Sequence, residues 1–259
     1  VTDLDGTLWH TDDEIPAATV AALRDVVGRV PLLIATGRRL ASTARPLARI
    51  DMTPPAVVLN GALGRDLATG EGFHRAPFPR DQAVEVLAAF RSVGLDPVVY
   101  VDAPDHEAVI SATPSTNPDH ARGLDALVDD LEEAVTVRPV LGFSLIGVEH
   151  RFATAGRDAV GEVAETHLDR SLDYPGLATI TVAPDGQSKW DGVLAFCHAQ
   201  GIDPGRVLAM GDGSNDLEML ERAAVALVPE VAHPAALERA DHVIGAAADG
   251  GWAAVLDHL

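Results

Sequence analysis

Two carboxylates stand close together at the start of the chain, in the run Asp3-Leu4-Asp5-Gly6-Thr7. Side chains alternate between the two faces of an extended strand, so positions i and i+2 point the same way. Asp3 and Asp5 are therefore expected to converge at the end of a strand, where Gly6 lets the backbone turn sharply. Crowded carboxylates repel each other unless a cation, a proton or a catalytic task gives them different roles.

An ordinary turn or a calcium-binding loop also uses the pattern Asp-x-Asp-Gly. A calcium loop requires further oxygen ligands at fixed spacings and a bidentate Glu at its twelfth position. Counting from Asp3, Glu14 stands at the twelfth position, but Thr7 is the one oxygen-bearing side chain at the fifth. On this motif alone, the turn and the catalytic site both remain open.

The elements that follow this motif alternate between strand and helix. Continuous apolar runs at 31–35 and 56–59 are typical of strands buried on both faces of a parallel sheet. Strands alternating with helices predict an α/β fold with a doubly wound parallel sheet. The expected elements are helices over 16–29 and from Thr36-Gly37-Arg38 to about residue 49, the two strands, and a hairpin over 65–76.

From about residue 80 the order of elements changes to helix, strand and strand, which predicts an open α+β sheet with helices on one face. Prolines and glycine mark both ends of this segment, at Pro77, Pro79 and Pro184-Asp185-Gly186. We therefore predict a core over 1–79 and 186–259 and an inserted α+β domain over 80–185. The helices expected from residue 80 onward are 81–93, 119–131, 155–168, 188–200, 215–224 and 250–258, and the strands are 97–102, 107–112, 139–147, 177–183, 206–210 and 224–228.

Polar residues stand where four of the apolar strands end: Asp3, Thr36, Asn60 and Gly211-Asp212. In open α/β sheets, ligands bind beyond the carboxyl ends of the strands, so these residues are expected to line one crevice. The run from Gly211 to Asp216 adds two carboxylates between a strand and a helix. Clustered carboxylates without sulfur or paired histidine ligands favour a hard cation, most simply Mg²⁺.

Lys189 is the only lysine in the chain, and every other basic residue is arginine. Lysine provides a compact point charge, whereas arginine is a broad planar group that does not fit the same small space. Chance survival of one surface lysine is the alternative. The position of Lys189, where the inserted segment leads back to the core at the start of a helix, favours a catalytic role.

The formal net charge of −20 argues against a nucleic-acid or anionic-membrane surface. It also repels anionic substrates unless the site supplies its own cations. Since no apolar run has membrane-spanning length and no leader pattern is visible, we expect a cytoplasmic protein. The single Cys197 is expected to be a buried thiol. Because a buried first strand needs about five residues, we also expect a few residues to precede Val1.

Taken together, these motifs resemble, in order, the four motifs of the haloacid dehalogenase-like (HAD) superfamily. They are the runs that begin at Asp3, Thr36 and Gly211, together with Lys189. The Thr-Gly-Arg form, Asn60-Gly61-Ala62 and the insertion are similar to the Cof-type branch, which has a subfamily IIB (C2B) cap. The turn from Val228 to Pro234 departs from the Gly-Asn-Ala-like turn usual in that branch.

This resemblance implies a Rossmann-like core, an inserted cap that closes over the site, and a Mg²⁺-dependent phosphatase. It would hydrolyse a small phosphorylated metabolite, with a sugar phosphate as the expected substrate, through an aspartyl-phosphate. Asp3 would be the nucleophile, and Asp5 the general acid and base. The residues implied in metal binding are Asp3, Asp5 (through its carbonyl), Asp212 and Asp216, and those implied in substrate binding are Thr36, Gly37, Arg38, Asn60, Lys189 and Asn215.

Several alternatives stay open at this point. A phosphomutase or other phosphotransferase shares the paired carboxylates, and a catalytically silent binding protein shares the fold. Arg38 and Asn60 could contact the cap or simply end a strand rather than bind substrate. Trp9 and His10 follow the first motif and are expected to be exposed loop residues.

Overall fold

A computed structural model describes residues 1–11, 14–171 and 173–259 of the chain. By its internal packing the chain divides into two compact units. The core unit comprises Val1–Arg75 and Ser188–Leu259, and the inserted unit comprises Ala76–Gln187. The core unit is thus assembled from two segments that are far apart in the sequence.

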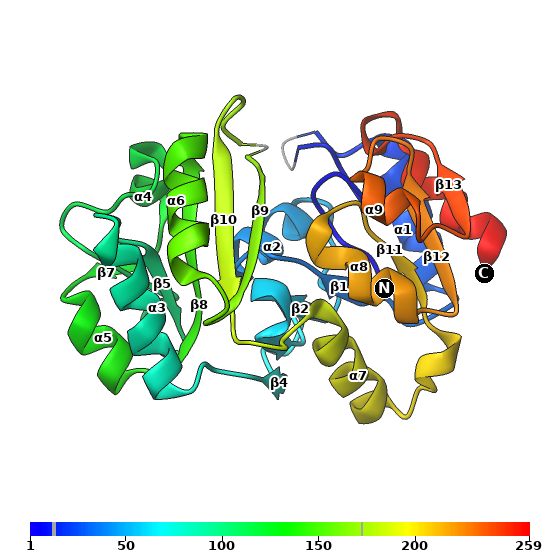
Figure 1. The fold of residues 1–259 in the computed structure, drawn as a ribbon. Helices are drawn as coiled ribbons and strands as arrows, with labels where there is room; N and C mark the ends of the chain where they lie inside the picture. Colours follow the sequence, from blue (N-terminus) through cyan, green and yellow to red (C-terminus); the bar gives the residue numbers. More distant parts are fainter. Residues whose placement is uncertain (12–13, 172) are drawn as a thin grey trace. The chain divides into compact units, whose positions relative to one another are not determined.

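A largely parallel sheet forms the centre of the core unit (Figure 1). Thr2 forms parallel bridges to Ile34 on one side and to Met210 on the other, so the start of the chain joins two groups of strands. The hairpin predicted over 65–76 is present and extends the sheet with antiparallel strands. The strands are β1 (Ile34–Ala35), β2 (Ala56–Val58), β3 (Leu63–Arg65), β4 (Gly72–Arg75), β11 (Leu208–Met210), β12 (Val225–Pro229) and β13 (His242–Ile244).

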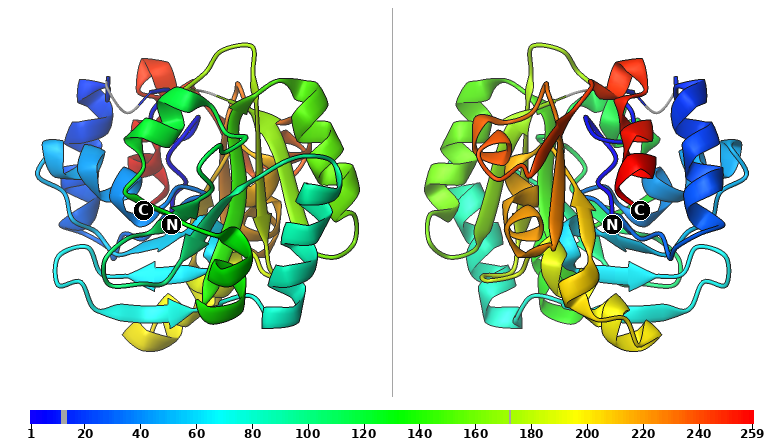
Figure 2. Two further views of the ribbon diagram at one scale, coloured as in Figure 1. Left: turned by 90° about the vertical axis from the view of Figure 1, so that its left-hand side faces the viewer. Right: turned by 90° about the vertical axis from the view of Figure 1, so that its right-hand side faces the viewer.

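Helices cover both faces of this sheet (Figure 2). One face packs against α7 and α8 through a buried cluster that includes Trp190, Val193 and Met219. On the other face α1 packs against η5, a 3₁₀ helix in which Trp252 is buried. This arrangement confirms the predicted doubly wound fold. The helices are α1 (Ala17–Val27), α2 (Leu40–Arg49), α7 (Lys189–Gln200), α8 (Leu217–Arg222) and α9 (Pro234–Leu237), and the 3₁₀ helices are η1 (Leu59–Gly61), η2 (Pro204–Arg206), η3 (Ser214–Asp216), η4 (Ala247–Asp249) and η5 (Gly251–His258).

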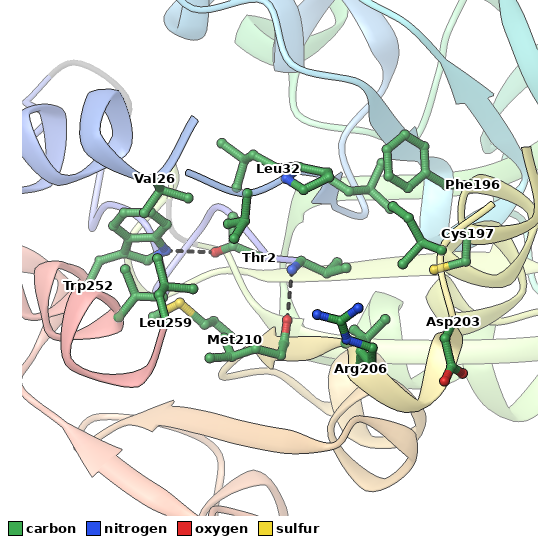
Figure 3. Close-up of a pocket in the computed structure, with 18 of the residues that line it drawn as sticks. Thr2, Val26, Leu32, Phe196, Cys197, Asp203, Arg206, Met210, Trp252 and Leu259 are labelled. Carbon is green, nitrogen blue, oxygen red and sulfur yellow. Dashed lines mark hydrogen bonds between the residues drawn. The ribbon is translucent and has the colours of Figure 1, made fainter. Parts of the chain in front are cut away.

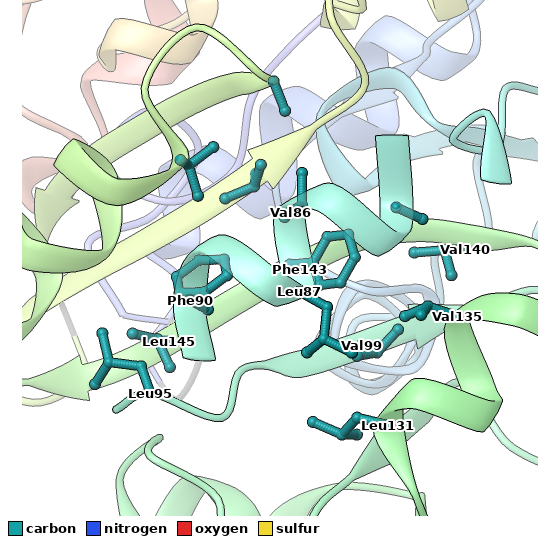
Figure 4. Close-up of a cluster of buried hydrophobic side chains, with 14 of the residues drawn as sticks. Val86, Leu87, Phe90, Leu95, Val99, Leu131, Val135, Val140, Phe143 and Leu145 are labelled. Carbon is teal, nitrogen blue, oxygen red and sulfur yellow. The ribbon is translucent and has the colours of Figure 1, made fainter. Parts of the chain in front are cut away.

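The inserted unit is a six-stranded sheet with the strand order β7-β6-β5-β8-β10-β9, in which only β6 and β7 are parallel. Helices α3, α5 and α6 contribute to its hydrophobic core, where Phe90 packs against Phe143 of the sheet (Figure 4). It is the α+β module predicted from the sequence. Its elements are α3 (Arg80–Ser92), β5 (Val98–Val101), β6 (Ala108–Ile110), α4 (Pro118–Gly123), β7 (Ala126–Val128), α5 (Leu131–Val137), β8 (Val140–Val148), α6 (His150–Val160), β9 (Glu165–Arg170) and β10 (Ala178–Ala183).

Two helices predicted in this unit are wrong over part of their length. The segment 119–131 contains α4 but continues as strand β7, which pairs with β6. The segment 155–168 contains the end of α6, but the helix stops at Gly161, whose φ is 55°, and the chain continues as β9. Strand pairing supplies these backbone hydrogen bonds: β7 pairs with β6, and β9 forms an antiparallel hairpin with the next strand, β10. Pairing between strands therefore overrides the local helical pattern.

The structure also tests the predictions for Cys197, for the last segment of the chain and for membrane-spanning helices. Cys197 is buried, as predicted. The last segment, expected as a helix over 250–258, is the 3₁₀ helix η5, and strand β13 was not predicted. Within the part of the chain that the structure describes, none of the helices has the length and apolarity needed to span a bilayer.

The packing of α7 against β2 depends on Gly192. A Cβ atom at this position would lie 2.3 Å from Cγ1 of Val57. Alanine favours a helix interior over glycine, but overpacking a core typically costs about 1–3 kcal/mol and outweighs that gain. We expect Gly192→Ala to lower the free energy of unfolding of the core unit, measured in urea by tryptophan fluorescence, since all three tryptophans lie in this unit.

Gly28→Ala is the matched control in the same unit, because Gly28 has a φ of −74° and a Cβ there would lie no closer than 3.4 Å to another atom. The double variant Gly192→Ala/Val57→Ala should recover part of the loss by making room for the new methyl group. Equal stability of Gly192→Ala and the native protein would contradict the close contact.

Candidate active site

Lys189 lies between two buried carboxylates. Its ammonium group donates hydrogen bonds of 2.7 Å to Oδ1 of Asp3 and of 2.7 Å to Oδ1 of Asp216. The side chains of Lys189 and Asp216 are 1% and 0% exposed, and that of Asp3 is 8% exposed. A buried charge is tolerated only when it is paired, so these three residues depend on one another for their ionised forms.

The start of α7 positions Lys189. Ser188 is the N-cap residue of this helix, and the carboxylate of Asp191, three residues further on, accepts from both the backbone N–H and the hydroxyl of Ser188, at 2.9 and 3.0 Å. Lys189 is the first residue of the helix, where the positive end of the helix dipole disfavours a cation. A buried cation at the unfavourable end of a helix needs a separate reason, which the two carboxylates provide.

Asp212 joins this group from the end of β11. Thr7 donates a hydrogen bond of 2.8 Å to Oδ1 of Asp212. Gly6 has a φ of +85°, and a Cβ on it would lie 2.3 Å from Oδ2 of Asp212. Only glycine therefore allows the first loop to approach the Asp212 carboxylate this closely.

The carboxylates of Asp3, Asp212 and Asp216 each place an oxygen within 4.8 Å of the others. The second oxygen of Asp216 accepts from the backbone N–H groups of Asp212 and Gly213, at 3.0 and 2.9 Å. All the donor atoms are hard oxygens, so the group suits a divalent cation such as Mg²⁺. A carboxylate has several lone pairs, so the bonds from Lys189 and Thr7 leave room for coordination by Asp3 and Asp212.

Burial and mutual repulsion shift the pKa values of the acids in this cluster. Burial raises the pKa of Asp3 well above its ordinary value, with neighbouring carboxylates adding to the effect and Lys189 opposing it. Burial, followed by the charge of Asp216, raises the pKa of Asp212 from 3.8 to about 7. The two carboxylates raise the pKa of Lys189 despite its burial, so it stays charged. A bound cation would offset this repulsion and favour the ionised forms of Asp3 and Asp212.

Asp5 has different partners. The guanidinium of Arg38 donates from Nε to Oδ2 of Asp5 at 2.5 Å and from Nη2 to Oδ1 at 2.6 Å. Arg38 also donates to the carbonyl of Ser42 at 3.1 Å, and its backbone N–H donates to the Thr36 hydroxyl at 3.2 Å. Asp3 and Asp5, two residues apart, therefore face two different cations.

Asn60 in η1 and Asn215 in η3 contact each other. The Asn215 side-chain amide donates to Oδ1 of Asn60 at 2.9 Å. Leu59 and Asn60 have φ values of 52° and 53°, a left-handed conformation that is uncommon for residues with a side chain and that clusters at functional sites. A Cβ at Gly37 would lie 2.9 Å from Oδ1 of Asn60, so the Thr36-Gly37-Arg38 turn packs closely against this pair.

The sequence-predicted residues of all four motifs lie in the core unit, and most of them are linked by these contacts. Two residues that contact them were not singled out. Thr7 belongs to the first motif and donates to Asp212, but the chain turns at residues 6–8, so spacing along a strand could not indicate this contact. Trp9 was expected to be exposed and is fully buried, with its indole N–H donating to Asp5, whereas His10 is exposed as expected.

A cavity of about 420 Å³ lies at the opposite edge of the core sheet (Figure 3). It is lined mainly by apolar residues near the amino ends of the strands, including Val1, Leu33 and Leu208. Trp252 lies at this cavity and donates to the Thr2 hydroxyl at 2.9 Å. None of the clustered carboxylates lines it, so we place the chemistry at the carboxyl edge of the sheet.

A doubly wound core with an inserted α+β unit and carboxylates clustered beside one buried lysine defines a class of hydrolase. The pattern of the haloacid dehalogenase-like hydrolase family matches residues 1–256, so the chain belongs to this family. The family predicted from the four motifs is confirmed.

The chain is also similar to curated proteins and to solved structures. The chain is 26% identical over 252 residues to the pyridoxal phosphate phosphatase YbhA of Escherichia coli, covering 94% of this chain and 91% of that protein. It is 25% identical over 240 residues to the chloroplastic endoribonuclease YBEY of Arabidopsis thaliana, covering 86% of this chain but only 40% of that longer protein. A HAD subclass IIB sugar phosphatase has the same fold, with a TM-score of 0.77, 20% identity, and coverage of 99% of this chain and 96% of that one.

The raised pKa of Asp212 predicts how the stability of the metal-free protein varies with pH. As pH rises from 3.8 to about 7, the unfolded chain releases the Asp212 proton while the folded protein still holds it. Stability in EDTA should therefore fall across this interval, because the folded state binds more protons. Asp212→Asn should reduce this fall, as measured by the melting temperature at a series of pH values.

Asp3 titrates in the same direction, so the slope in Asp212→Asn should be smaller but not zero. Asp25→Asn removes a carboxylate on the exposed face of α1 and controls for the change in net charge. If both variants gave the same pH profile as the native protein, the assignment of this slope to Asp212 would be wrong.

Proposed function

We propose that this protein is a Mg²⁺-dependent phosphatase that hydrolyses a small phosphorylated metabolite through an aspartyl-phosphate on Asp3. The observation that carries the proposal is the buried carboxylate of Asp3, bonded to Lys189 at 2.7 Å and grouped with Asp212 and Asp216. Family membership supports the reaction class, and the contacts of this chain support the individual roles.

In the first step, an oxygen of Asp3 attacks phosphorus, and the bond from phosphorus to the leaving alcohol oxygen breaks. Asp5 in its protonated form gives its proton to that oxygen, so the alcohol leaves neutral. Lys189 and the Thr36 hydroxyl bind the phosphoryl oxygens, whose negative charge is spread in the transition state. Lys189 would exchange one of its carboxylate bonds for a phosphoryl oxygen.

In the second step, Asp5 accepts a proton from a water molecule as the water oxygen attacks the phosphorus of the aspartyl-phosphate. The bond between phosphorus and Asp3 breaks, which releases phosphate and restores both carboxyl groups to their starting forms. One residue thus serves first as acid and then as base. Asp5 is bonded to Arg38 and Trp9 rather than to Lys189, so its proton transfers would leave the bonds of the Lys189 cluster unchanged.

Mg²⁺ would be held by the carboxylates of Asp3 and Asp212 and by the backbone carbonyl of Asp5. Asp216 would act without binding the cation directly, since both of its oxygens already accept hydrogen bonds from Lys189 or from backbone N–H groups. When bound, the cation supplies positive charge that neutralises the phosphoryl oxygens. Together with Lys189, it gives this acidic protein the local positive potential that an anionic substrate requires.

We further propose that the substrate is a sugar phosphate or a molecule of similar size. One relative is named a pyridoxal phosphate phosphatase, and one solved structure is that of a sugar phosphatase. The substrates in both names are small phosphate monoesters. Gly37, Arg38, Asn60 and Asn215 would contact the substrate around the phosphate. The inserted domain would act as the cap and select substrates by their leaving group. We propose residues 80 and 185 as its limits.

A phosphomutase or other phosphotransferase is the rival on the same fold. It would pass the phosphoryl group to a second sugar rather than to water. A screen of phosphorylated metabolites for phosphate release, followed by product analysis with each active compound, separates the two reactions. Phosphate released in equal amount to the alcohol identifies a phosphatase.

The first test of the proposal uses Asp3→Asn. Hydrolysis of p-nitrophenyl phosphate should require Mg²⁺, stop in EDTA, and fall by about three orders of magnitude or more in this variant, because the amide is not a nucleophile. Asp25→Asn, on an exposed helix face, should keep native activity. Turnover by Asp3→Asn at the native rate would contradict a mechanism in which Asp3 is the nucleophile.

The second test asks whether the shape of the cation matters as well as its charge. Lys189 is 1% exposed and contacts two carboxylates at 2.7 Å, so the wider guanidinium of arginine does not fit. We expect Lys189→Arg to lose about 10²-fold or more in kcat, the scale of losing one transition-state donor.

Circular dichroism should first establish that the Lys189→Arg variant is folded. Arg206→Lys, in the 3₁₀ helix η2 before β11, is the reverse exchange away from the carboxylate cluster and should leave kcat unchanged. Native-like kcat in folded Lys189→Arg would show that any cation suffices.

A further inference from the structure

We propose that Trp9 is a positioning residue for Asp5, and that its indole N–H fixes the carboxylate that exchanges the proton with the leaving group. This inference rests on the proposed function, because it assigns no role to Trp9 unless Asp5 is the general acid. It concerns a side chain of this sequence that none of the four motifs contains.

The contact between the two residues is direct. Nε1 of Trp9 donates a hydrogen bond of 3.0 Å to Oδ1 of Asp5. The same oxygen accepts from Nη2 of Arg38 at 2.6 Å, while Oδ2 accepts from Nε of Arg38 at 2.5 Å. Asp5 is therefore held by three N–H donors from two side chains.

Trp9 also contacts the other donor. The guanidinium carbon of Arg38 lies 5.6 Å from the centroid of the Trp9 ring, within the range of a cation–π contact. One indole thus supplies a hydrogen bond to the carboxylate and an aromatic face to its cation. Removing it would loosen both members of the Asp5–Arg38 pair.

The indole itself is rigidly placed. Trp9 is fully buried, and its backbone N–H donates to the carbonyl of Leu4 at 3.1 Å. Its carbonyl accepts from the N–H of Gly6 at 2.8 Å, which closes the loop that carries Asp5. A rigid donor of this kind keeps its direction even when the Arg38 side chain moves, for example on contact with substrate.

The consequence concerns proton transfer. A carboxyl group that donates to a leaving oxygen must lie within hydrogen-bond reach of it in the correct orientation. If Trp9 fixes that orientation, its loss penalises substrates that need the proton most, because a basic alcohol leaves poorly as an anion. p-Nitrophenolate leaves readily without a proton, so its phosphate ester should be affected least.

The experiment compares kcat/KM of native protein and Trp9→Phe for aryl phosphates that differ only in the ring substituent, together with an alkyl phosphate. We expect the value for p-nitrophenyl phosphate to stay within about threefold and that for the alkyl phosphate to fall by about tenfold or more, since general acid catalysis contributes about 10²–10⁴-fold. Inhibition by inorganic phosphate should be unchanged, because the phosphate contacts are intact.

Trp252→Phe is the matched control. Trp252 is 1% exposed and donates to the Thr2 hydroxyl at 2.9 Å, so the same exchange removes a similar buried hydrogen bond away from Asp5. Trp252→Phe should lower kcat/KM by the same factor for every substrate or leave it unchanged. If Trp9→Phe does not fold, β-(3-benzothienyl)alanine at position 9 keeps the ring shape and removes only the N–H.

Equal losses for every substrate in a folded Trp9 variant would overturn the positioning role. So would native values throughout. Neither result would affect the proposed phosphatase, which Asp3→Asn and EDTA test with the native Trp9 in place. Conversely, full activity of Asp3→Asn would remove the mechanism itself, whatever the Trp9 variant does.

Discussion

The site depends on one buried ion-pair arrangement, in which the ammonium of Lys189 lies between the carboxylates of Asp3 and Asp216. Three crowded acids in a buried place repel one another, and burial already raises the pKa of Asp3 and Asp212. A compact cation at the start of α7 lowers this repulsion without filling the site. Breaking such a pair leaves an uncompensated buried charge, which is why the start of the chain, η3 and α7 are tied together here.

The same arrangement separates the tasks of the two acids in the first motif. Asp3 faces Lys189 and the clustered carboxylates of Asp212 and Asp216, whereas Asp5 faces Arg38 and Trp9. In the proposed reaction one acid must be a permanent anion that attacks, and the other must gain and lose a proton. Two neighbouring carboxylates can divide these roles because each has its own set of donors. The division is a property of their partners rather than of their spacing.

Much of the fold followed from local pattern. The apolar runs at 31–35 and 56–59, each ending in a polar turn, predicted parallel strands whose carboxyl ends meet, and the core unit has this form. The inserted α+β unit was also predicted. The errors fall where strand pairing overrides a helical pattern: residues 126–128 pair in parallel with β6, and residues 165–170 form an antiparallel hairpin with β10. A pattern that is read one segment at a time does not show which other segment will supply the hydrogen bonds of a strand.

The sequence by itself determined the chemical inventory: the two acids of the first motif, the acids that follow β11, the single lysine, and the family to which they point. It also determined their common edge, since parallel strands place their ends together. Only the tertiary structure decided the partners. It directs Arg38 to Asp5, brings Thr7 to Asp212, and buries Trp9 against the Asp5 carboxylate instead of leaving it exposed. Spacing along a chain fixes which face a side chain occupies, but the partner it meets there depends on how distant segments pack.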